Sequence, residues 1–143
     1  MRNNYTYDSS SRLATKVDAK GQKLVYSYDS YNRVTQLARY YTTTTEDTQQ
    51  RTNYYYDSNT STYDSSYSTF VLGRLAWVQY YGGNCTSLGP PRTGCDKVQE
   101  SYKYNAAGLM LGKRVRIIRG SADLTGQNPI KGPVAPYART GGA

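Results

Sequence analysis

Histidine is absent from this chain of 143 residues, and only 21 residues, about 15%, are Leu, Ile, Val or Phe. Without histidine the chain lacks the commonest general base, the Ser-His and Cys-His nucleophile systems and the commonest metal ligand. No apolar run approaches the roughly 18 residues that a membrane-spanning helix needs. The polar first residues, 1–11, are not those of a signal peptide, and the length allows one domain.

Tyrosine is what the chain has in excess, with 17 copies and a formal net charge of +8. So low an aliphatic content combined with such a charge usually indicates disorder. A tyrosine ring, however, can be buried while its hydroxyl keeps a polar partner. The composition therefore leaves two alternatives, a disordered basic chain or a folded one whose core is built largely from tyrosine.

A short motif occurs four times and decides between these alternatives. Its first copy begins at Tyr5, and the second begins 21 residues later at Tyr26. The third begins at Tyr54, but its second half arrives only at residues 73–75 after a polar stretch. The fourth begins at Tyr102 and ends with Leu in the place of Arg. Four related units indicate a repeat protein.

Each copy predicts a strand, a tight turn and a return strand. The Tyr-x-Tyr pattern has a period of two, so both rings fall on one face of a strand; these are Tyr5, Tyr7, Tyr26, Tyr28, Tyr54, Tyr56, Tyr102 and Tyr104. Asp or Asn then begins the turn because its side chain accepts backbone N–H groups, and Asn or Gly at the fourth position tolerates positive φ. The expected turn residues are Asp8, Asp29, Asp57 and Asn105, with Asn32, Gly73 and Gly108 at the fourth position. Ser11 fits that position less well.

The pattern Tyr-x-Tyr-Asp-x-x-Gly-Arg-Leu resembles the RHS or YD repeat, here as a fragment or a short member of the family. The resemblance covers residues 5–41, 54–57, 73–81 and 102–118. It implies an all-β fold of antiparallel β-hairpin repeats that join into an open or spiralling sheet. In the family such sheets enclose a toxin or stand on a cell surface.

The repeats predict a domain over residues 1–119 and an extended, irregular tail over 120–143, in which Gly and Pro occur without periodicity. Polar insertions lie near 42–51 and 58–69, and a loop bounded by two cysteines spans 83–96. Four consecutive threonines in the first insertion favour β structure, which predicts a protruding hairpin arm. The tail is expected to dock on a neighbouring subunit.

Cys85 and Cys95 are separated by ten positions. Two cysteines without histidine make a poor zinc site, so a disulfide that closes the loop is the favoured interpretation, and two free thiols are the alternative. A disulfide places the protein outside the cytosol, in the extracellular space or at the cell surface.

The ten carboxylates give no persuasive catalytic pair, because the repeat explains Asp8, Asp29 and Asp57 as turn residues. We therefore expect no enzymatic activity, no metal and no cofactor.

Residues 113–119 carry four positive charges, which could bind nucleic acid or an anionic envelope polymer. A solvent-facing basic strand that discourages aggregation is the favoured alternative, so nucleic acid is not an expected partner. Tyr40, Tyr55 and Tyr81 belong to runs of adjacent tyrosines and could contact a glycan, or they could simply form ladders that hold the sheet together.

These expectations converge on a non-catalytic structural subunit that pairs with copies of itself in an extracellular fibre or tube. Four hairpins leave two free sheet edges and a thin core, and free edges are templates for pairing. The alternatives are a piece of a toxin-enclosing RHS shell and a carbohydrate-binding surface module.

Overall fold

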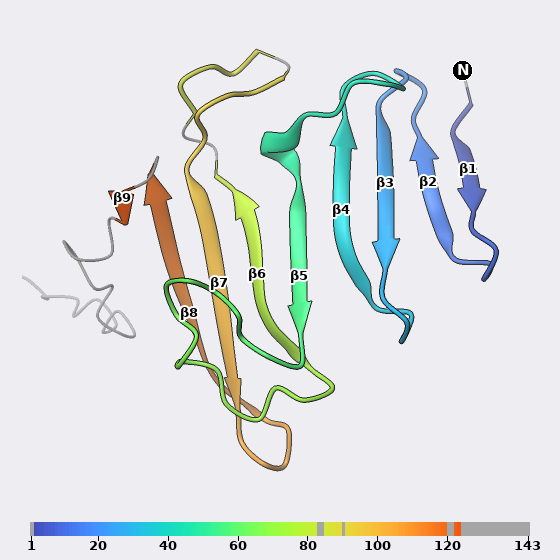
Figure 1. Ribbon diagram of the computed structural model, residues 1–143. Coiled ribbons are helices and arrows are strands. Elements are labelled where there is room, and N and C mark those ends of the chain that lie inside the picture. The colour runs from blue at the N-terminus through green and yellow to red at the C-terminus, as the bar shows by residue number, and fades with distance from the viewer. Residues whose placement is uncertain (1, 83–84, 90, 120–121, 124–143) are drawn as a thin grey trace, which may run out of the picture.

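The computed structural model describes residues 2–82, 85–89, 91–119 and 122–123. Nine strands follow one another in chain order in one antiparallel sheet (Figure 1). They are β1 (Asn4–Tyr7), β2 (Leu13–Val17), β3 (Lys23–Tyr28), β4 (Val34–Tyr40), β5 (Thr52–Tyr56), β6 (Leu75–Tyr81), β7 (Lys97–Tyr104), β8 (Met110–Arg119) and β9 (Ala122–Asp123). The predicted all-β fold is confirmed. The predicted tail over 120–143 lies, apart from β9, outside the described residues.

The hairpin turns of the repeat share one hydrogen-bond pattern. At the first turn the Asp8 carboxylate accepts hydrogen bonds from the backbone N–H groups of Ser10 and Arg12, at 2.9 and 3.0 Å. The turn that begins at Asp29 repeats both bonds, and the turn that begins at Asn105 keeps the second of them, from the Leu109 N–H. The fourth residue has positive φ in each of these turns, and Ser11 adopts it as well, with φ 60°. The turn is therefore built from contacts that reach no further than four residues.

A fourth turn of the same kind closes the hairpin at its other end. The Asp18 carboxylate accepts the backbone N–H groups of Lys20 and Gln22, and Gly21 has φ 81°. This turn lacks a preceding Tyr-x-Tyr. Its presence shows that the Asp-x-x-Gly element alone is sufficient to specify the turn.

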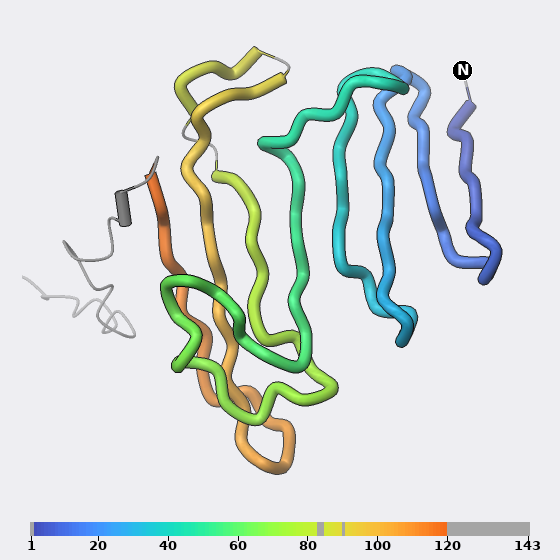
Figure 2. The backbone as a smooth tube through the Cα atoms, viewed as in Figure 1, coloured from blue at the N-terminus to red at the C-terminus, as the bar shows by residue number. Residues whose placement is uncertain are grey.

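The third copy keeps its ends together although its turn carries a long insertion. The Asp57 N–H donates to the Arg74 carbonyl at 3.1 Å, as the equivalent groups do in the uninterrupted turns. Residues 58–73 fold back across strands β6 to β8 (Figure 2). Gln99 donates to the Ser61 hydroxyl at 2.6 Å, and Arg114 pairs with Asp64. The insertion thus forms a second layer, beneath which Gln99 and Ser101 are buried.

The first polar insertion is not the protruding arm that its four threonines suggest. It consists of bends, an isolated bridge between Tyr40 and Glu46, and the 3-10 turn η1 (Thr48–Gln50). Asp47 is fully buried, and its N–H donates to the Arg39 carbonyl at 2.8 Å. A buried carboxylate needs several donors, so the segment folds back onto the sheet to provide them.

The loop between β6 and β7 packs against this first insertion. Cys85 and Cys95 form the predicted disulfide. The Cys95 N–H donates to the Gln49 side chain at 3.1 Å, and the Arg92 N–H donates to the Asp47 carboxylate at 3.2 Å. Two loops that are 45 residues apart in the chain therefore support each other at one end of the sheet (Figure 1).

Candidate functional site

One contact recurs wherever one repeat meets the next. In β2 and β3, Thr15 pairs with Val25. Because the strands are antiparallel, the residue three positions before Thr15, which is Arg12, lies opposite the residue three positions after Val25, which is Tyr28. The same count places the Arg of each later repeat opposite the second Tyr of the following one: Arg33 opposite Tyr56, and Arg74 opposite Tyr104. All three junctions between repeats therefore share a register.

Two interactions hold this register at each junction. The guanidinium carbon lies 4.6, 4.4 and 5.8 Å from the centre of the tyrosine ring opposite it, for Arg12, Arg33 and Arg74. The tyrosine hydroxyl donates to the carbonyl of the residue after that Arg: Tyr28 to Leu13 at 2.8 Å, Tyr56 to Val34 at 2.9 Å and Tyr104 to Leu75 at 3.0 Å. We call this pair of contacts the repeat clamp. A cation–π contact of this kind contributes about 0.5–1 kcal/mol at exposed sites, and the hydrogen bond contributes about the same.

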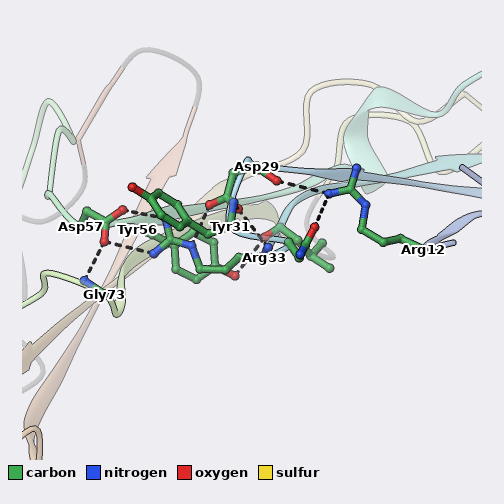
Figure 3. Close-up of polar contacts among 9 residues, drawn as sticks. Arg12, Asp29, Tyr31, Arg33, Tyr56, Asp57 and Gly73 are labelled. Atoms are coloured by element: carbon green, nitrogen blue, oxygen red, sulfur yellow. Dashed lines mark hydrogen bonds and ion pairs between the residues drawn. The ribbon is translucent and has the colours of Figure 1, made fainter. Parts of the chain in front are cut away.

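The Arg of the clamp also ties neighbouring turns together (Figure 3). Arg33 binds Asp29 of its own turn at 2.7 Å and the Asp57 carboxylate of the next turn through two nitrogens, at 3.0 and 2.6 Å. Arg12 likewise binds Asp8 of its own turn and Asn32 of the next. A planar guanidinium can make these parallel contacts, whereas a lysine cannot. This explains why the repeat carries Arg at this position.

These contacts shift the ionisation of the turn carboxylates. The backbone N–H and guanidinium of Arg12 hold the pKa of Asp8 below its usual value of 3.8. Desolvation alone would raise the pKa of Asp29, but hydrogen bonds from Arg33 outweigh it and the pKa is lowered. Hydrogen bonds from Arg33 and the Gly73 N–H lower the pKa of Asp57. All three aspartates therefore stay charged at neutral pH.

The third junction fits its glycine closely. Arg74 lies close to the turn of the fourth copy, which begins at Asn105. A Cβ added to Gly108 in that turn would come within 2.7 Å of the Arg74 guanidinium. Gly108 also has φ 87°, which disfavours any other residue. The turn conformation therefore favours glycine here, and a larger residue would also displace the end of the Arg74 side chain.

The two ends of the row of clamps are open. Tyr7 is 65% exposed. Among the described residues, Tyr7 has neither an Arg over its ring nor a carbonyl that accepts from its hydroxyl, whereas Tyr28, Tyr56 and Tyr104 have both. At the other end Leu109 takes the place of Arg and is 67% exposed. Among the described residues, nothing pairs with the outer edge of β1, and only β9 pairs with the outer edge of β8, at Ile118 and Arg119. These two ends form the candidate site.

The three tyrosines predicted to contact a glycan, Tyr40, Tyr55 and Tyr81, are each half-buried. The Tyr55 ring stacks on Trp77 at a centroid distance of 3.7 Å. Burial raises the pKa of Tyr55, and nearby Tyr81 adds to the rise. Lys23 lies 4.2 Å from the centre of the Tyr40 ring. Tyr40 and Tyr55 therefore each have one ring face in contact with a neighbour.

The basic run of β8 is exposed only in part, and its charges are paired. Arg114 and Arg116 bind the buried Asp64 at 2.7 and 3.3 Å. Lys113 pairs with Glu100, and Arg119 pairs with Asp96. The run therefore forms ion pairs within the protein. The sequence suggested either binding of an anionic polymer or a solvent-facing strand that discourages aggregation, and neither alternative includes these ion pairs.

Sequence reasoning did not assign the Arg of the clamp a role. It expected the turn at Lys20-Gly21-Gln22 but missed Asp18 as its first residue, and it missed the buried carboxylates of Asp47 and Asp64. A signal was present for two of these, since Arg recurs in three of the four copies and Asp18 begins the same Asp-x-x-Gly spacing. The sequence contains no comparable signal for the buried carboxylates of Asp47 and Asp64, because their partners come from distant segments.

The described part of the chain contains no group of three or more Cys, Asp or Glu side chains that could hold a metal ion. It also contains no helix long and apolar enough to cross a membrane.

Comparison with known proteins agrees with the repeat geometry. Residues 5–40 match the family model described as RHS Repeat. No curated protein matches the chain. The matched residues contain the first two copies of the motif, the first clamp and three of the four shared turns. Residues 5–40 therefore carry an RHS repeat, and the same hairpin, turn and clamp continue beyond them.

Proposed function

We propose that the chain is a non-catalytic structural subunit that extends its sheet by pairing with copies of itself, in an extracellular fibre or tube. One observation carries the proposal. Each open end of the sheet exposes two large side chains: Tyr5 and Tyr7 on β1, which are 44% and 65% exposed, and Leu109 and Leu111 just before and within β8, which are 67% and 59% exposed.

The clamp register predicts how two copies meet. Applied between β8 of one copy and β1 of the next, it sets Tyr7 opposite Leu109 and Tyr5 opposite Leu111. The carbonyl of Met110 then occupies the place of the acceptors that Tyr28, Tyr56 and Tyr104 use. The four residues of β1 lie beside the start of β8 and leave its far end to β9. The exposed apolar side chains cover one another, which favours association.

Leu109 makes this junction weaker than those within the chain. A leucine side chain can contact the Tyr7 ring, but it supplies neither the positive charge nor the link to the neighbouring turn that Arg12 and Arg33 supply. Copies with a formal charge of +8 also repel one another. We therefore expect reversible association that strengthens as salt screens the repulsion.

Sedimentation velocity across a range of protein concentrations, with electron microscopy of the concentrated sample, tests the proposal. We expect concentration-dependent growth into filaments. Leu109→Glu places a charge against Tyr7 and should abolish growth. Leu88→Glu makes the same change at an exposed residue in the cysteine loop, which is distant from both edges, and should leave growth intact.

A gain-of-function variant distinguishes association in the clamp register from nonspecific hydrophobic association. Asn105→Asp combined with Leu109→Arg restores the repeat sequence at the fourth turn and supplies the missing clamp. It should promote assembly although it removes an exposed apolar side chain and adds charge. Monomers at all concentrations in the wild type, or weaker association in the double variant, would contradict the proposal.

The role in an RHS shell that encloses a toxin is the second candidate. The same open ends favour it, because they accept further hairpins of the same design as well as another copy. Closed shells rather than filaments in the micrographs of native material would support that role. The turn roles of Asp8, Asp29 and Asp57 support a non-catalytic protein, and the disulfide supports a location outside the cytosol.

A further inference from the structure

A cavity of about 210 Å³ lies where β2, β3 and β4 end, far from the clamp residues of the opposite sheet end. Its lining includes the basic residues Lys16, Lys23 and Arg39, the tyrosines Tyr40 and Tyr41, and Asp18. Leu24 pairs with Lys16 in β2 and with Arg39 in β4, so these two cations lie on one face of the sheet, whereas Lys23 lies on the other face. Lys16 and Arg39 together concentrate positive potential at the cavity, which favours an anion.

These cations differ from the other basic groups of the sheet because no carboxylate in the described part of the chain pairs with them. Within the described residues, Lys16 and Lys23 contact only the rings of Tyr5 and Tyr40, at 5.8 and 4.2 Å. The Arg39 side chain forms no hydrogen bond, ion pair or ring contact with any residue that the structure describes. By contrast, the basic run of β8 is consumed by internal ion pairs.

The one carboxylate in the cavity is already engaged. One oxygen of Asp18 accepts the backbone N–H groups of Lys20 and Gln22, at 2.8 and 2.9 Å, so it serves the turn. Lys16 and Arg39 together keep a surplus of one positive charge over Asp18. A guanidinium is suited to hold a carboxylate through two parallel hydrogen bonds, with an ammonium group adding charge.

The remaining lining suits a sugar ring. Gln22 and Gln50 offer amides for hydroxyl groups, and Leu24 with the Tyr41 ring offers an apolar surface for a ring face. The volume lies below the roughly 300–1,000 Å³ of pockets for drug-sized ligands, so it fits one charged unit of a longer chain.

We propose that this cavity binds a carboxylated sugar unit of an acidic polysaccharide, with Arg39 and Lys16 on the carboxylate. Neither the β1 edge nor the start of β8 lines the cavity, although Lys16 also contacts the Tyr5 ring of β1. The site allows a fibre of such subunits to attach to an acidic glycan layer along its length.

Calorimetric titration of the full chain with tetragalacturonate at 0.15 M NaCl tests the site, with neutral maltotetraose as the uncharged probe. We expect saturable binding of the acidic tetramer and none of the neutral one. Arg39→Gln should weaken binding by about tenfold or more, the effect of losing one charge-assisted contact. Lys20→Gln removes the same charge from an exposed turn residue outside the cavity and should change affinity less than about twofold.

Circular dichroism confirms that both variants fold. Equal losses in Arg39→Gln and Lys20→Gln would show general charge attraction and overturn the site, as would the absence of saturable binding. Equal binding of maltotetraose would overturn the role of the carboxylate. Tighter binding of a thymidine octanucleotide, lost in Arg39→Gln, would reassign the cavity to nucleic acid and overturn the sugar proposal. Failure of any of these leaves the sedimentation test of assembly unaffected.

Discussion

The two halves of the sheet use the same hairpin but are stabilised in different ways. In residues 2–41 the strands carry no insertion, and the only buried apolar residue among those described is Ala38. In residues 52–119 a folded-back insertion and a disulfide-closed loop surround the strands, and Ala76, Trp77, Val78, Val98 and Ile118 are buried. A YD hairpin can thus be held by turns and clamps alone or can acquire a packed core.

Equivalent positions of the repeat make the contrast concrete. Three residues after the Arg stand Thr15, Gln36 and Trp77 in successive copies. Trp77 is buried and stacks on Tyr55, whereas Gln36 is half-buried and hydrogen-bonds to Asn53 at 2.9 Å. The backbone is the same at these sites, so the side chain and its cover decide how much each copy contributes to stability.

The largest expected effect breaks the core of the C-terminal half. Trp77→Ala should lower the free energy of unfolding by about 3–5 kcal/mol, because it leaves a cavity beside Tyr55. Urea denaturation followed by circular dichroism measures this loss. Gln36→Ala, at the equivalent position of the N-terminal half, should cost no more than about 1.5 kcal/mol. Similar losses in the two variants would show that the halves do not differ as described.

A matched variant sharpens this result. The Trp77 indole N–H is buried and has no hydrogen-bond partner among the described residues. Trp77→Phe should therefore retain more stability than Trp77→Ala does, since it keeps the stacked ring and removes an unsatisfied donor.

Reduction of the Cys85–Cys95 disulfide should have the next largest effect. A closed loop of this length stabilises by roughly 2–3 kcal/mol in the chain-entropy account. Because Cys95 contacts Gln49 and Arg92 contacts Asp47, reduction should also loosen the first insertion. Hydrogen exchange with and without a reductant measures both effects. Faster exchange in the turns at Asp8 and Asp29 would show that the disulfide also stabilises the N-terminal half, and would contradict its assignment to the C-terminal half.

A smaller effect tests the clamp that both halves share. Tyr56→Phe and Tyr104→Phe each remove one hydroxyl that donates to a carbonyl of the preceding repeat, and each should cost about 0.5–1.5 kcal/mol. Tyr7→Phe makes the same change where no clamp exists and should leave the stability of the dilute monomer unchanged. Thermal unfolding at low concentration compares the three, and a cost at Tyr7 equal to that at Tyr56 would argue against the clamp.

The smallest effect comes from acid. The pKa values of Asp8, Asp29 and Asp57 are lowered on folding, so their contribution is complete above the unfolded value of 3.8 and is lost as pH falls through the folded values. Below about pH 4 the Ser10 and Tyr31 amides, which donate to these carboxylates, should exchange faster.

The Leu109 amide provides the internal control for this measurement. It donates to the side chain of Asn105, which does not titrate. The C-terminal half does contain Glu100, whose pKa is also lowered, by hydrogen bonds from Tyr102, Tyr80 and Lys113 that outweigh desolvation, but Glu100 lies outside the turn. Equal acceleration of the Leu109 amide would show that acid acts on the whole sheet rather than on the aspartate turns.

Much of the fold could be predicted from the sequence because the repeat is local. The Tyr-x-Tyr strand, the Asp turn and the positive φ at the fourth position depend on residues within a few positions of one another. The disulfide was predictable by the same logic, from a short spacing and the absence of other metal ligands. The 42–51 insertion was predicted wrongly because threonine favours β structure, whereas the tertiary demand of the buried Asp47 overrides that preference.

The amino-acid sequence by itself determined the unit: a hairpin whose turn closes through hydrogen bonds over two to four residues. Only the tertiary structure decided how the units join. The clamp reaches 15 to 29 residues along the chain, and Asp64 meets Arg114 across 50. Such contacts depend on strand register and on which face an insertion covers, and no short stretch of sequence specifies either. For the same reason Lys16 and Arg39, which pair with no carboxylate among the described residues, lie at one cavity, while the cations of β8 are paired.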